Sequence, residues 1–148
     1  MVISRVIEIL NDFDFACQRC SKCCRHTPGT VYLTENDVEL LITHLNIPFE
    51  RFKQECCNVL IQNGKDLLVL KEKRNYDCIF WSDGCIVYDS RPAQCRSFPF
   101  WPEIVEMPDV RKEEMKRCPG IGKKGDITNE DKLKYYLDRL NSVYFEVK

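Results

Sequence analysis

The sequence predicts a small α+β domain in which short helices and a β-hairpin are organised around one or more cysteine-ligated metal centres. Three observations support this prediction: apolar residues recur at helical spacing, an Asp-Gly pair stands between two β-rich runs, and ten cysteines occur in 148 residues. A chain of this length is expected to bury roughly 70% of the surface that its unfolded form exposes. The cysteines are therefore not needed merely to make folding possible.

The first part of the chain predicts helices. A short helix is followed by an extended lead-in at 13–15. A second helix begins at Thr34, because Asp37 completes a capping-box pattern, and stops at Asn46. Pro48 restarts a helix, since proline is tolerated in a first turn. The apolar stripes of these helices are Ile3, Val6, Ile7 and Leu10; Val38, Leu41, Ile42 and Leu45; and Phe49, Phe52 and Cys56.

Strands are expected in the middle of the chain. Residues 67–70 form a buried strand, and 78–88 form a hairpin around Asp83-Gly84, a strong hairpin signal. The stretch RPAQCRSFPFWP is expected to be irregular, because prolines interrupt it.

Two helices are expected after this stretch. One covers 109–117, and the last begins at Thr128 with an apolar face of Leu133, Tyr136, Leu137, Leu140 and Tyr144. The domain organisation is therefore a cysteine-cluster metal-binding domain over 1–127 and a C-terminal amphipathic helix over 128–148, packed on the same domain.

Charge and hydropathy narrow the class of protein. Twenty-two basic and 23 acidic residues give a net charge of −1, so the chain has no basic footprint for nucleic acid. No apolar run reaches the roughly 18 residues of a membrane span, and the start lacks the features of a signal peptide. The expected location is the cytoplasm, where disulfides rarely persist. Ten cysteines there indicate metal or redox chemistry, and a disulfide-stabilised scaffold is the alternative.

The cysteines divide by position. Four lie in the run CQRCSKCC, and four others are scattered, which suffices for two four-thiolate sites. The adjacent pair Cys56-Cys57 is left over, and is expected to lie within a helix with Cys56 on the apolar face as a buried thiol. The eight candidate ligands are Cys17, Cys20, Cys23, Cys24, Cys78, Cys85, Cys95 and Cys118.

Spacing leaves the metal open but favours iron slightly. Cys17, Cys20 and Cys23 match the first part of a ferredoxin-type run, and Cys118-Pro119 resembles its closing Cys-Pro. Zinc sites use the same two-residue spacing. The neighbours Cys23 and Cys24 are expected to point in opposite directions, so that Cys24 serves a second site or bridges two metals.

Two further expectations concern the surroundings of the ligands. A hairpin would hold Cys78 and Cys85 roughly 13 Å apart, so either they serve different sites, which we favour, or the segment is an irregular knuckle. Arg91 and Arg96 are expected to offset thiolate charge from outside the ligand set. GIGKKG, at 120–125, lacks the spacing of a phosphate-binding loop and is expected to be a plain loop.

Three stretches together carry a family resemblance: CQRCSKCC, GCIVYDSRPAQCRSFPFWP and CPGIG. They resemble the CxxCxxCC family of zinc- or iron-chelating proteins, the YkgJ-like cysteine cluster proteins, over about residues 13–122. The resemblance implies that the same eight cysteines form the chelating set, with Cys56 and Cys57 outside it. Some larger relatives are flagellin lysine methylases associated with an iron–sulfur cluster and S-adenosylmethionine, but no methyl-donor pocket is recognisable in this sequence.

The sequence therefore supports two functional interpretations. In the first, the chain binds iron or zinc in a structural, metal-handling or redox-accessory role. In the second, it is an enzyme whose iron-containing centre supports redox chemistry or protein lysine methylation. An enzyme should show an open coordination position or a cofactor pocket, whereas a structural site is closed by four ligands. Neither a catalytic residue nor a protein partner is identified.

Overall fold

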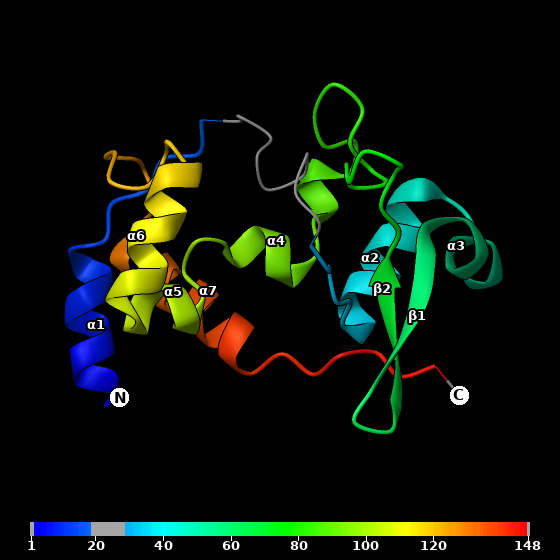
Figure 1. Ribbon diagram of the computed structural model, residues 1–148, viewed down its shortest axis with the longest axis horizontal. Helices are drawn as coiled ribbons and strands as arrows, with labels where there is room; N and C mark the ends of the chain where they lie inside the picture. Colours follow the sequence, from blue (N-terminus) through cyan, green and yellow to red (C-terminus); the bar gives the residue numbers. More distant parts are fainter. Residues whose placement is uncertain (1, 19–28, 148) are drawn as a thin grey trace. The chain divides into compact units, whose positions relative to one another are not determined.

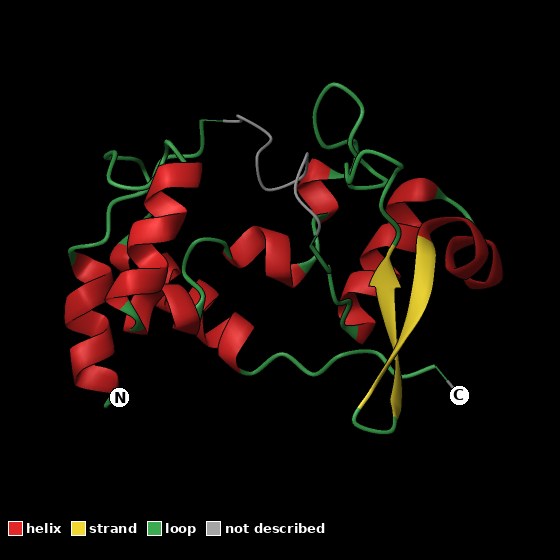
Figure 2. Ribbon diagram, viewed as in Figure 1, coloured by secondary structure: helices red, strands yellow, loops and turns green. Residues whose placement is uncertain are grey.

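The computed structural model describes residues 2–18 and 29–147. Contacts within the chain group it into two compact units. The helical unit comprises the described residues of Met1–Lys22 together with Ser97–Asn141, and the hairpin unit comprises those of Cys23–Arg96 together with Ser142–Lys148. Figure 1 labels the helices and strands of both units, and Figure 2 colours helices red and strands yellow.

The helical unit contains α1 (Ile3–Asn11), α5 (Pro102–Glu106), α6 (Pro108–Arg117) and α7 (Asn129–Leu140). Helices α5 and α6 each begin with a proline, at the position where the missing amide hydrogen costs no intrahelical bond. Phe100 is fully buried, and the rings of Phe13 and Phe15 meet it edge-on, with centroids 5.3 and 6.0 Å away. The buried core is Val6, Leu10, Phe13, Phe15, Phe100, Ile104, Val105, Ile121 and Tyr136.

The hairpin unit contains α2 (Glu35–Leu45), α3 (Phe49–Cys56), β1 (Cys57–Gln62), β2 (Lys65–Leu70), the 3₁₀ turn η1 (Tyr88–Ser90) and α4 (Ala93–Ser97), whose last residue begins the helical unit's second segment. The strands pair antiparallel from Cys57 opposite Leu70 to Gln62 opposite Lys65. Asn63 and Gly64 join them with φ of 52° and 75°, the two positive values of a type I′ turn. The buried core is Leu33, Val38, Leu41, Phe52, Cys57, Leu68, Leu70, Phe80 and Val87.

Most of the predicted elements are confirmed. The structure contains the first helix, the buried strand at 67–70 and the helix predicted at 109–117. The capping box of Thr34 and Asp37 is present, and Asn46 ends α2 in the left-handed conformation. The α+β class is therefore confirmed, whereas organisation around a metal centre stays a prediction. Among the described residues, no helix is long and apolar enough to cross a membrane.

Three predictions of local structure between residues 78 and 144 are wrong. Residues 78–88 form turns and isolated bridges, and the hairpin lies at 57–70 instead, because the Asn-Gly pair at 63–64 closes it. The stretch after Arg91 contains α4 and the start of α5, since its prolines stand before or at the start of these helices. Helix α7 ends at Leu140, so Tyr144 lies outside it and bridges Thr34.

Candidate metal centre

The helical unit brings Cys17 and Cys118 to the same end of a short antiparallel pairing. The amide of Ala16 donates to the carbonyl of Gly120 at 3.0 Å, and the amide of Gly122 donates to the carbonyl of Asp14 at 2.8 Å. Because the two segments run antiparallel, the residue after Ala16 and those before Gly120 lie at one end of the pairing. That end carries Cys17 and Cys118.

Two glycines make this pairing possible. A Cβ atom at Gly120 would lie 2.3 Å from the backbone oxygen of Ala16, and one at Gly125 would lie 2.6 Å from that of Phe15. Such distances to backbone atoms cannot be relieved by a side-chain rotation. GIGKKG is a loop, as predicted, and its first and last glycines allow it to lie against the residues that lead to Cys17.

In the hairpin unit, the residues that follow 19–28 are held by side chains next to other cysteines. The amide of Gly29 donates to the Glu72 carboxylate at 2.7 Å, and Glu72 forms a β-bridge with Cys78. The side-chain amide of Gln94 donates to the carbonyl of Thr30 at 2.7 Å. Its oxygen accepts from the amide of Tyr32 at 3.1 Å. Residues 29–32 are therefore held beside Cys78 and beside the residue that precedes Cys95.

Cys78 and Cys85 belong to an irregular knuckle. The amide of Trp81 donates to the carbonyl of Cys78 at 2.9 Å, closing a turn, and Trp81 then bridges Cys85. The ladder that would have held the two cysteines roughly 13 Å apart is absent from this described segment, so the argument for separate sites loses its basis. The Lys73 ammonium donates to the carbonyl of Trp81 and places a positive charge at the knuckle.

A buried carboxylate positions α4, which carries Cys95. Asp37 is only 1% exposed, and one of its oxygens accepts from the amide of Thr34 while the other accepts from the amide of Ala93, both at 2.9 Å. One side chain thus caps the first turn of α2 and fixes the start of α4. Because Cys95 lies in that short helix, its position depends on Asp37.

The two predicted arginines brace the same segment. Arg96 donates from Nη1 to the carbonyl of Arg91 at 2.8 Å. Arg91 donates from Nε to the carbonyl of Tyr88 at 2.9 Å, and its guanidinium lies 3.9 Å from the centre of the Tyr88 ring. These contacts give both arginines a structural role. Their role in offsetting thiolate charge stays a prediction.

Cys56 and Cys57 lie where helix α3 meets strand β1. Helix α3 ends at Cys56 and β1 begins at Cys57, so the expected mid-helix position is wrong, and it is Cys57 that is buried. Burial raises the pKa of the Cys57 thiol to about 12, and also raises the pKa of Cys56. Metals bind thiolates, and both shifts disfavour the thiolate form. That Cys56 and Cys57 stand outside the ligand set stays a prediction.

Cys20, Cys23 and Cys24 lie outside the described residues. Within residues 2–18 and 29–147, no three histidine, cysteine, aspartate or glutamate side chains gather closely enough to hold a metal ion.

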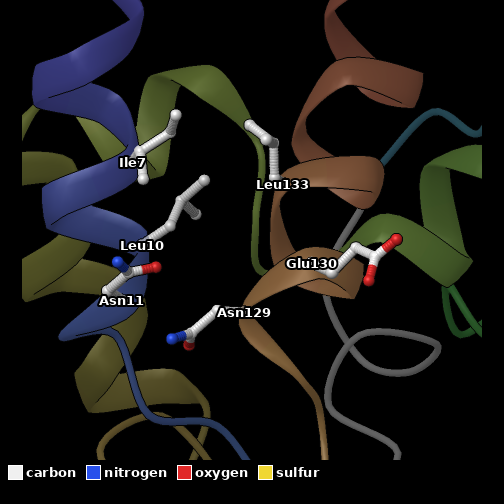
Figure 3. Close-up of a pocket in the computed structure, with 6 residues that line it drawn as sticks. All are labelled: Ile7, Leu10, Asn11, Asn129, Glu130 and Leu133. Atoms are coloured by element: carbon white, nitrogen blue, oxygen red, sulfur yellow. The ribbon is translucent and has the colours of Figure 1, made fainter.

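A separate hollow of about 360 Å³ lies between α1 and α7. Figure 3 shows Ile7 and Leu10 facing Leu133 across it, with Asn11 and Asn129 toward one end. Its lining contains neither cysteine nor histidine, so it takes no part in the candidate metal centre.

Sequence reasoning found the thiols but missed the residues that position them. Of these, Asp37 was recognised only as a cap, because one of its two oxygens serves a local pattern and the other reaches Ala93, far along the chain. The glycines of GIGKKG were a visible signal of close backbone approach, but their partner segment was not predictable from spacing. Glu72 and Gln94 gave no sequence signal at all.

Comparison with known proteins agrees with the cysteine pattern. The CxxCxxCC family, described as "Putative zinc- or iron-chelating domain", matches residues 16–131. The matched range includes all eight candidate ligands. No solved structure matches the chain. Because the match covers most of the chain, this protein belongs to the CxxCxxCC family.

Proposed function

We propose that the chain is a metal-binding protein that chelates iron, with zinc as the competing ion. The proposed ligands are Cys17, Cys20, Cys23, Cys24, Cys78, Cys85, Cys95 and Cys118. The observation that carries the proposal is the set of hydrogen bonds made by the residues before and after the cysteine run. Ahead of the run, Ala16 pairs with Gly120 close to Cys118; after it, Gly29 and Thr30 are bonded beside Cys78 and Cys95.

The chemistry of the donor set supports a metal that accepts soft ligands. Thiolates suit zinc and iron–sulfur clusters. Four thiolates around a divalent ion carry a formal net charge of −2, which positive side chains nearby would offset. Lys73 contacts the segment between Cys78 and Cys85, and Arg96, which is bonded to Arg91, directly follows Cys95. An iron–sulfur cluster would supply electron transfer, whereas zinc held by four thiolates would be structural. Such thiols stay reduced in the cytoplasm, which is the location we infer.

Anaerobic purification from iron-replete cells tests the proposal directly. We expect brown protein with bound iron, and acid-labile sulfide if the iron is in a cluster, measured by elemental analysis and visible absorbance. Colourless protein with stoichiometric zinc would reverse the choice of metal. Protein with no metal and ten titratable thiols would contradict chelation.

A matched pair of variants tests the ligand set. Cys24→Ser removes a proposed ligand and should lower metal per chain and melting temperature, because metal binding contributes to folding where the site forms only on folding. The Cys56→Ala/Cys57→Ala double variant should keep full metal content, with a packing cost of about 1–2 kcal/mol. The reverse result would show that the two cysteine pairs are assigned the wrong way round.

A further inference from the structure

The two strands of the hairpin differ in what lies along their outer edges. Strand β2 is bonded on both sides, since the amide of Leu68 donates to Phe145 at 3.1 Å and the amide of Leu70 donates to Val31 at 3.0 Å. Strand β1 pairs with β2 along its inner edge. Within the part of the chain that the structure describes, no strand or bridge lies on the outer edge of β1.

The hydrogen-bond pattern shows which groups face that open edge. Because the Leu68 and Leu70 amides point away from β1, the residues opposite them, Val59 and Cys57, are at non-hydrogen-bonded positions of the hairpin. Alternation adds Ile61 to this set. The backbone amides and carbonyls of Val59 and Ile61 are therefore directed outward.

The edge lacks three features that commonly protect such strands. The sequence CNVLIQ contains no charge and no proline, and it pairs with β2 without a bulge. Natural edge strands are commonly protected by these three features. Instead, Val59 is 46% exposed, Leu60 38% and Ile61 75%. Three consecutive exposed apolar side chains, next to backbone groups that no described strand pairs, leave this edge open to another strand.

We propose that the covering strand is β1 of a second copy of this chain, paired antiparallel about a two-fold axis at Leu60. Val59 then exchanges two backbone hydrogen bonds with Ile61 of the second copy, and the symmetric pair does the same. Leu60 lies opposite Leu60 of the second copy, and Asn58 lies opposite Gln62, so apolar groups meet apolar groups and amides meet amides.

The sequence of β1 favours a second copy over an unrelated strand, because this axis makes the strand complementary to itself. No charged side chain lies along β1, so none is buried in the centre of the interface. A register shifted by two residues, with Val59 opposite Val59, would instead place Asn58 against Leu60.

Sedimentation of the full chain, as purified, tests this surface. We expect a concentration-dependent monomer–dimer equilibrium, with a dissociation constant raised about tenfold or more by Ile61→Lys, which puts a charge in the apolar centre. Ile61 is largely exposed, so the monomer should remain folded. The control Val143→Lys changes an 81% exposed residue of the same unit and should leave association unchanged. A chain that stays monomeric, or a dimer unaffected by Ile61→Lys, would overturn the proposal.

Amide hydrogen exchange gives a second readout at single residues. The Val59 and Ile61 amides should gain protection as the protein concentration rises, because only the dimer bonds them. The Leu60 amide should not change, since it faces β2 within one copy. Equal behaviour of all three amides would overturn the proposed pairing, even if a dimer forms through another surface.

Discussion

The two units hold their cysteines by different kinds of contact. In the helical unit, Ala16 and Gly120 meet through backbone atoms alone, and the approach requires a glycine. In the hairpin unit, the side chains of Asp37, Glu72 and Gln94 make the connections. Backbone pairing leaves no side chain to remove but tolerates no added atom, whereas side-chain contacts can be removed singly. We therefore expect the first arrangement to fail as a whole and the second to weaken in steps.

The largest expected effect comes from Gly120→Ala. The new Cβ would lie 2.3 Å from the oxygen of Ala16, so the pairing must open. We expect a loss of about 3 kcal/mol in the free energy of unfolding, together with reduced metal per chain, measured by denaturant unfolding and elemental analysis. Gly29→Ala is the control, because no atom of the described residues lies within 4 Å of its added Cβ. Equal stability of the two variants would contradict the backbone-pairing argument.

Asp37→Ala should have the next largest effect. It leaves the amides of Thr34 and Ala93 without their carboxylate acceptor, and we expect a loss of about 2–3 kcal/mol. Asp37→Asn should recover part of this loss, since one oxygen remains. Glu35→Ala, at an exposed position in the same helical turn, is the control and should cost little. Melting temperatures of the three variants rank their stability losses. A small loss for Asp37→Ala would contradict the claim that this side chain connects α2 with α4.

Gln94→Ala should have a smaller effect on stability than on metal retention. Two neutral hydrogen bonds to Thr30 and Tyr32 are lost, at about 1 kcal/mol in total. If these bonds orient the cysteine run, metal affinity should fall about tenfold, as measured by competition with a chelator. Gln62→Ala removes a different contact to Tyr32, its hydroxyl, and should leave metal affinity unchanged.

The smallest effect at neutral pH is expected for Cys57→Val. The native thiol has its pKa raised to about 12, from about 9 in the unfolded chain. Above pH 9 the unfolded state loses this proton first, so stability falls as the pH rises through this window. The valine variant lacks this contribution and should show a shallower decline between pH 9 and 11, with no difference in slope below pH 9. Denaturant unfolding across pH 7–11 measures both; identical slopes would show that Cys57 is not buried as described.

Sequence patterns predicted correctly those structural features that depend on interactions between neighbouring residues. The capping box at Thr34 and Asp37 and the stop at Asn46 depend only on neighbours in sequence, and both are confirmed. Asp83-Gly84 and Asn63-Gly64 are both turn sequences, so the turn signal alone could not tell which of them closes a hairpin. Only Asn63-Gly64 joins two paired strands, whereas a single isolated bridge spans Asp83-Gly84. The β1 strand was missed because its apolar residues do not alternate with polar ones.

The candidate site divides in the same way. The sequence pattern singled out the cysteine run and four further cysteines as candidate ligands, and the family match supports metal chelation by a chain with this pattern. The contacts that position the described cysteines join residues far apart in the chain, such as Asp37 with Ala93. No periodicity or motif reports such a pair, because each member has an ordinary local role. How the eight cysteines are shared between sites stays a prediction for the variants above.

The pairing of Ala16 with Gly120 also has a consequence for the order of folding. It closes a chain segment of roughly 100 residues, and the entropy lost on closure grows with the length of the segment. The β1–β2 hairpin closes over two residues and can form within microseconds. We therefore expect Cys17 and Cys118 to come together late, after the hairpin unit has formed. A metal ion that arrives early would meet a chain whose coordination sphere is still being assembled.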